Sequence, residues 1–199
     1  MLGIVGPVAF VAAWVGCGLA TDGYSGVSDA ISELAAVGAP TRWVMTAGFV
    51  VFGVAVPVYA ARAVRASLPG RAWIALVVTG LATLGVAAVP LGRGTDGLHG
   101  AFASLGYVSL ALAPALGAVE LRRHGRGAAA TWSLLAAAGA GACLLATLPG
   151  PAHGLFQRLG LAFGDAWIVA TAVVLLRSGH LIDVRPAADP SPDPSPDPA

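Results

Sequence analysis

Six apolar runs, each about 20 residues long, make up most of this chain and restrict its fold more than any other feature. They cover residues 2–20, 42–64, 72–91, 98–121, 128–148 and 155–176. A helix of about 20 residues, rising 1.5 Å per residue, crosses roughly 30 Å of hydrocarbon. The sequence therefore predicts an all-α fold in which residues 1–180 form one membrane domain, a polytopic bundle of six transmembrane helices.

The composition agrees with a protein whose main partner is the lipid bilayer. Hydrophobic residues make up 57% of the 199 residues and charged residues only 11%, against about 25% charged residues in soluble domains. A net charge of +1 argues against a nucleic-acid partner. The absence of lysine, together with abundant Ala, Gly and Val, suggests a GC-rich bacterial genome and hence a bacterial cell membrane.

Arginines alternate along the chain in step with the six runs. The second and fourth connections and the segment after the last run hold most of them: Arg62, Arg65, Arg71, Arg122, Arg123, Arg126, Arg177 and Arg185. The first, third and fifth connections hold Arg42, Arg93 and Arg158. Because cytoplasmic loops of membrane proteins carry the excess of arginine, this pattern predicts that both termini are cytoplasmic.

The first connection contains the most polar stretch between apolar runs. Read as a helix over about residues 26–37, it places Val27, Ala30, Ile31 and Leu34 on one side. The other side holds Ser25, Ser28, Asp29, Ser32 and Glu33. The spacing predicts a short amphipathic helix at the membrane surface, with its acids turned toward a shared polar site.

Two acids and two histidines are the candidate catalytic residues. Asp29 and Glu33 are four residues apart, so on a helix they are neighbours that repel unless a cation relieves them. His99 and His153 each open an inward-going helix. Together with Asp29 these histidines would make a site for a divalent metal such as zinc, with room for a water. The alternatives are a solvated acidic face and histidines that bond only to loop carbonyls.

Six further polar residues are candidates for substrate binding. They are Ser28, Ser32, Arg93, Gln157, Arg158 and Asp165. Arg93 and Arg158 would hold a phosphate group. Asp165 falls near mid-membrane, where an acid is costly and should face the bundle interior. It is either a neutral, hydrogen-bonded structural acid or a proton or ion relay.

One motif resembles a known family. The run Tyr24-Ser25-Gly26-Val27-Ser28-Asp29-Ala30-Ile31-Ser32-Glu33-Leu34, followed by proline-ended helices and His99, is similar to domain-of-unknown-function family 998 of prokaryotic integral membrane proteins. The resemblance covers roughly residues 1–180. It implies a six-helix membrane protein and no established activity, so the function stays open.

The predicted site admits several functions. The first is a membrane-embedded hydrolase or transferase acting on a lipid or lipid-linked headgroup at the outer leaflet. The alternative is a non-enzymatic lipid-binding or membrane assembly protein. A haem protein with His99 and His153 as axial ligands, or a small transporter using Asp165, ranks lower.

Residues 186–199, rich in Pro, Asp and Ser, are predicted to be a disordered tail.

Overall fold

The computed structural model describes residues 1–147 and 150–182, and every regular element in these ranges is helical. The elements are α1 (Leu2–Leu19), the 3₁₀ helix η1 (Ile31–Ala35), α2 (Arg42–Tyr59), the π-helical turn η2 (Ala60–Val64), α3 (Arg65–Ser67), α4 (Ala72–Ala88), α5 (Asp96–Arg123), α6 (Gly127–Ala146) and α7 (His153–Ser178). The predicted tail at 186–199, and residue 148 of the fifth predicted helix, lie outside the described residues.

Five helices are long and apolar enough to cross a membrane, so the chain is of the multi-pass membrane type. They are α1, the continuous helix from α2 through α3 (Arg42–Ser67), α5, α6 and α7. The remaining predicted span, 72–91, corresponds to α4, which has 17 residues and ends at Ala88. It ends early because Pro90 follows Val89, and the residue before a proline is disfavoured in helical conformation.

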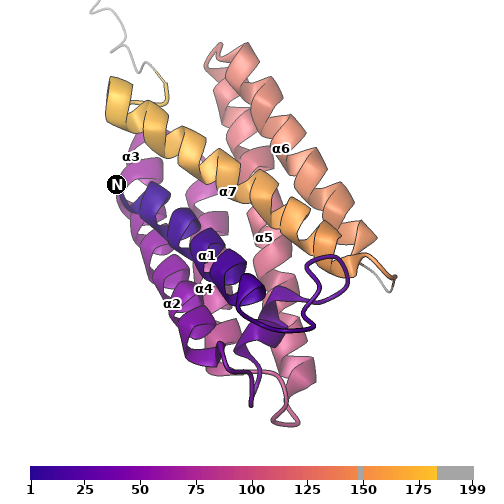
Figure 1. Cartoon of the computed structure of the whole chain (residues 1–199). Coiled ribbons are helices and arrows are strands. Elements are labelled where there is room, and N and C mark those ends of the chain that lie inside the picture. Colours follow the sequence, from indigo (N-terminus) through magenta and orange to yellow (C-terminus); the bar gives the residue numbers. More distant parts are fainter. Residues whose placement is uncertain (148–149, 183–199) are drawn as a thin grey trace, which may run out of the picture.

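The helices pack in chain order and the bundle closes on itself (Figure 1). α1 packs on α2, α2 on α4, α4 on α5, α5 on α6 and α6 on α7, and α7 also contacts α1 and α5. Large apolar side chains, among them Val44, Leu81, Leu112 and Leu135, are exposed on the outside of the bundle. An exposed apolar belt of this kind is typical of a surface that contacts lipid.

Glycines allow the helices to approach closely. A Cβ atom on Gly80 of α4 would lie 2.2 Å from the ring of Pro57 in α2, and one on Gly53 would lie 2.7 Å from Leu84. Small residues at such crossings let helix backbones come together, as is common between membrane helices.

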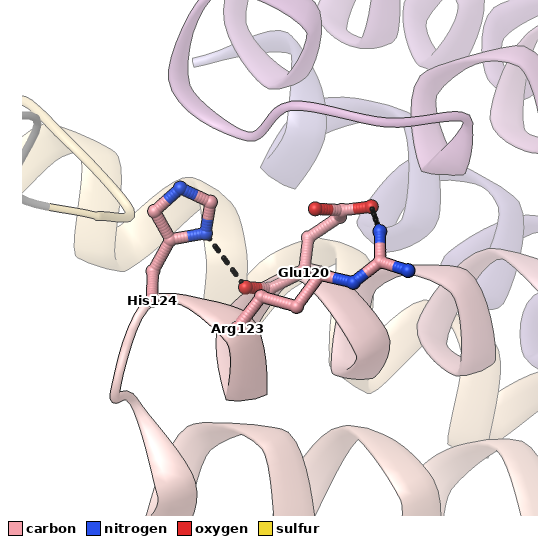
Figure 2. A network of polar contacts seen from close by, with 3 residues as sticks. All are labelled: Glu120, Arg123 and His124. Carbon is pink, nitrogen blue, oxygen red and sulfur yellow. Dashed lines mark hydrogen bonds and ion pairs between the residues drawn. The ribbon is translucent and has the colours of Figure 1, made fainter.

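The bundle end that holds both Met1 and the end of α7 also carries most of the arginines. Figure 2 shows its polar network, in which Arg123 forms a 3.0 Å ion pair with Glu120 and the ring of His124 bonds the Glu120 carbonyl at 2.9 Å. Glu120 also packs on the turn before α4, since a Cβ on Gly70 would lie 2.8 Å from its side chain. These contacts join only the end of α5 and the turn before α4.

At the opposite end, the first connection bridges the other two loops. The N–H of Val37 donates to the carbonyl of Leu91 in the α4–α5 connection at 3.0 Å. The N–H of Leu155, in the first turn of α7, donates to the carbonyl of Val27 at 3.0 Å. The polar residues of the first connection are thereby held against the starts of α5 and α7.

Candidate functional site

The segment from Gly26 to Val37 differs from the predicted amphipathic α-helix. It consists of turns followed by the five-residue η1. The hydroxyl oxygen of Ser25 accepts the N–H groups of Val27 and Ser28, each at 3.3 Å. The carboxylate of Asp29 accepts the N–H of Ser25 at 2.7 Å and the hydroxyl of Ser28 at 2.8 Å. Such local side-chain bonds compete with helical backbone bonds, which explains why the turn replaces the helix.

Arg158 of α7 fastens this turn to the bundle. Its Nη1 donates to the carbonyls of Gly26 at 2.8 Å, Asp29 at 2.9 Å and Gly154 at 2.8 Å. Its Nη2 donates to the hydroxyl of Tyr24, and the guanidinium lies over the rings of Trp14 and Tyr24. With only 9% of its surface exposed, this cation is stabilised by carbonyl dipoles and aromatic faces.

Gln157, the neighbouring residue, fastens the start of η1. Its side-chain oxygen accepts the N–H of Ile31 at 2.8 Å, and its side-chain nitrogen donates to the hydroxyl of Tyr107 in α5. Ile31 is 2% exposed and Leu34 is 1% exposed. The 3₁₀ helix therefore seals the bundle end with two buried apolar side chains and turns Glu33 outward.

A cavity of about 60 Å³ lies in the bundle beneath η1. Its lining comes from α1, α2, α4, α5, α7 and η1 and is mainly apolar, with four phenylalanines: Phe10, Phe49, Phe52 and Phe102. The polar side chains that line it are Ser32, Thr79, Thr83, His99, Tyr107 and Gln157. The volume is several times the about 10–15 Å³ that a single water requires.

His99 is the unusual member of this lining. It is 4% exposed, and its Nδ1 lies 2.6 Å from the carbonyl oxygen of Val89. A carbonyl can only accept, so Nδ1 carries the proton. Among the described residues that line the cavity, the Nε2 of His99 is the buried polar atom without a hydrogen-bond partner. A buried polar atom without a hydrogen-bond partner lowers the stability of the fold unless a ligand or a water pairs with it.

The comparisons with known proteins identify the family. The sequence pattern of the family described as "Protein of unknown function (DUF998)" matches residues 4–174. The chain belongs to this family. No match was found among curated proteins or among solved structures. The match spans the whole bundle from α1 into α7, so the Arg158 contacts and the cavity both lie within the family's region.

The other predicted site residues lie apart from the cavity, except Ser32 and Gln157. Glu33 is exposed and accepts the N–H of Ala30 at 3.1 Å. Arg93 is exposed in the α4–α5 connection. His153 is half-buried, and its ring bonds the carbonyl of Gly150 at 3.3 Å. Asp29, Glu33 and His153 thus bond within their own turns, whereas Nε2 of His99 has no partner among the described residues.

The predicted metal site would need Asp29, His99 and His153 together. Over residues 1–147 and 150–182, no group of three or more His, Cys, Asp or Glu side chains is arranged to hold a metal ion. Asp29 lies in the turn held by Arg158, and His99 faces the cavity. The structure brings Asp29 near Arg158 and places His99 with Gln157.

Asp165 is halfway along α7 and 5% exposed. Neither carboxyl oxygen has a hydrogen-bond partner among the described residues. The expectation that it faces the bundle interior is met. Its role as a structural acid or as a relay stays a prediction.

Three aromatic residues complete the site and were not among the predicted ones. The rings of Tyr24 and Trp14 lie against Arg158, and the hydroxyl of Tyr107 accepts a hydrogen bond from Gln157. Tyr24 stands at the start of the quoted motif, which could have marked it as part of the same turn as Ser25, Ser28 and Asp29. Nothing in the sequence pairs Trp14 or Tyr107 with residues more than 40 positions away, because helix rotation in the bundle decides those contacts.

The turn should respond to acid through Asp29. Its pKa is lowered from the ordinary 3.8, first by the Ser25 N–H and then by the Ser28 hydroxyl. A lowered folded-state pKa stabilises the fold above the ordinary pKa, and this stability is lost as pH falls through the lowered value. We expect Asp29→Asn to lower the thermal midpoint at about pH 6, with a smaller difference from wild type at about pH 3. An equal difference at both pH values would contradict this.

Proposed function

We propose that this protein binds a membrane-derived apolar molecule in the cavity beneath η1, as a lipid-binding protein rather than as an enzyme. The observation that carries the proposal is the mainly apolar cavity with the buried, unpaired Nε2 of His99 in its wall. Small-molecule sites are typically apolar concavities with a few placed polar groups that fix orientation. This combination supports binding of an apolar body with one polar group.

The contacts of the charged residues favour binding over headgroup chemistry. A phosphate-holding arginine needs accessible donors, but both terminal nitrogens of Arg158 donate within the protein, and its Nε, which has no partner among the described residues, is buried. A carboxylate base needs a free oxygen facing a substrate, but both oxygens of Asp29 accept bonds from its own turn. The hydrolase or transferase remains the alternative, and a headgroup-cleavage product formed by the purified protein would support it.

The orientation is part of the proposal. The end that carries Arg62, Arg65, Arg122 and Arg123 would face the cytoplasm of a bacterial cell, as the distribution of arginines supports. The cavity, near the opposite end, would then take its molecule from the outer half of the bilayer.

Filling the cavity tests the proposal. Gly106 lines the cavity, and a Cβ there would meet only the Cβ of Ala82, at 3.6 Å. We expect Gly106→Leu to fold and to reduce the lipid that co-purifies in detergent by about tenfold, which is roughly 1.4 kcal/mol. Lipid extracted from the purified protein is quantified by mass spectrometry.

Gly100→Leu is the matched control. Gly100 is in the same helix, is exposed, and has nothing within 4 Å of its added Cβ. It should retain the wild-type amount of lipid. Equal lipid in wild type and Gly106→Leu, with both folded, would contradict binding in this cavity.

A further inference from the structure

The polar wall of the cavity offers an acceptor rather than a donor at His99. The Nδ1 proton is committed to the carbonyl of Val89 at 2.6 Å. In the neutral ring, the second nitrogen then carries a lone pair and no proton. The Nε2 of His99 can therefore be satisfied only by a group that donates a hydrogen bond.

The side chains of Thr79, Thr83, Tyr107 and Gln157 in the lining each have a partner, whereas the half-buried hydroxyl of Ser32 has none among the described residues. The hydroxyl of Thr79 bonds Ser109 and the Ala75 carbonyl, each at 2.9 Å, and that of Thr83 donates to the Thr79 carbonyl at 2.9 Å. Gln157 is bonded at both its oxygen and its nitrogen. A phosphate or carboxylate would find no arginine here, since the described lining of the cavity contains none.

We infer that the ligand is a lipid alcohol, an aliphatic chain whose hydroxyl donates to Nε2 of His99 while the chain lies among the phenylalanines. This inference rests on the proposed function and adds the chemical class of the ligand. A hydroxyl on an apolar chain supplies a hydrogen-bond donor for Nε2 of His99. The chain supplies apolar contacts for Phe10, Phe52 and Phe102. Pairing a buried acceptor that is otherwise unsatisfied gives the alcohol its advantage over chains without a donor.

Two probes that differ by one donor test the inference. They are a fatty alcohol with a photoreactive diazirine in its chain and the methyl ether of the same alcohol, which lacks the hydroxyl proton. Each is irradiated with detergent-purified wild-type protein at about pH 8, where imidazole is neutral. Labelled peptides are then quantified by mass spectrometry. We expect the alcohol to label cavity-lining peptides of α1, α2 and α5 about five- to tenfold more than the ether does, as expected for one hydrogen bond.

Variants show whether the preference comes from His99. In His99→Phe the alcohol and the ether should label equally. Thr83→Val, which changes another cavity-lining side chain whose hydroxyl bonds only its own helix, should keep the wild-type preference. If Thr83→Val loses the preference as His99→Phe does, the assignment to His99 is overturned.

The wild-type experiment tests the class of ligand separately from binding in the cavity. Equal labelling of the cavity by both probes overturns the lipid-alcohol inference and leaves the proposed binding function intact. Labelling of the cavity by neither probe, with label only on the lipid-facing outside of the bundle, overturns both. Stronger labelling by the ether also overturns the inference, because it would mean that the wall donates rather than accepts.

Discussion

Replacing Arg158 with methionine is expected to detach the first connection from the bundle and to destabilise the protein by about 3–5 kcal/mol. The substitution keeps much of the side-chain volume but removes every donor. The carbonyls of Gly26, Asp29 and Gly154 would each lose a charge-assisted bond. Because these carbonyls are partly or fully buried, water replaces the lost bonds poorly, and the penalty is larger than that of an ordinary surface bond.

Two measurements check the effect of Arg158→Met. The thermal midpoint in detergent should fall, and hydrogen exchange should rise in peptides that cover residues 24–31. Arg158→Lys should recover only part of the loss, since an ammonium group cannot direct donors as a planar fork does. Increased exchange spread evenly over α5 and α6, without a local rise at 24–31, would mean that Arg158 does not act through the first connection.

Arg93→Met is the matched control for charge removal. Arg93 is at the same end of the bundle and is exposed. Its replacement should change stability by no more than about 0.5 kcal/mol, as for ordinary surface substitutions. A fall as large as that of Arg158→Met would show that positive charge at this end, and not the specific bonds, stabilises the protein.

The membrane architecture was predictable because long apolar runs have few alternatives. Every predicted run corresponds to a helix, and five of these helices are long and apolar enough to cross a membrane. Boundaries shifted where local chemistry intervened: α4 stops at Ala88 before Pro90, and the second helix continues through a π-helical turn to Ser67. Apolar periodicity carries no information about such ends.

The first connection was harder to predict because two patterns competed there. Ile31 and Leu34 have helical spacing and are both buried, but Val27 on the same predicted side is 51% exposed, so the apolar side of the prediction agrees with the structure only in part. Ser25, Ser28 and Asp29 instead bond one another and the backbone, which favours a turn. The Asp29 bonds also explain why its carboxylate does not face a shared site.

The role of each polar residue depended on contacts between distant parts of the chain. Arg158 was predicted to hold a phosphate, yet its donors go to carbonyls 129 and 132 positions earlier in the chain. His99 was predicted as a ligand or an acid/base group, and the structure places it in a cavity that only the packed bundle creates. A sequence alone does not show which polar groups already have partners.

Gly154→Ala is expected to produce the second large loss, because the turn lies directly against the start of α7. A Cβ on Gly154 would lie 2.3 Å from the carbonyl oxygen of Asp29, 2.9 Å from its nitrogen and 2.9 Å from Nη1 of Arg158. Two of these atoms belong to backbone, which cannot rotate away, so the turn must move and stretch its bonds to Arg158. We expect a destabilisation of about 1–3 kcal/mol, the usual cost of overpacking, measured as a lower thermal midpoint in detergent.

Gly97→Ala is the control that isolates contact from helix propensity. Gly97 is the second residue of α5, as Gly154 is the second residue of α7, and an added Cβ there meets nothing within 4 Å. Alanine favours a helix over glycine by up to about 1 kcal/mol, so Gly97→Ala should be neutral or slightly stabilising. In the double variant Gly154→Ala with Arg158→Met, the losses should be less than additive, since both changes release the same turn. Fully additive losses would show that Gly154 and Arg158 act on separate parts of the fold.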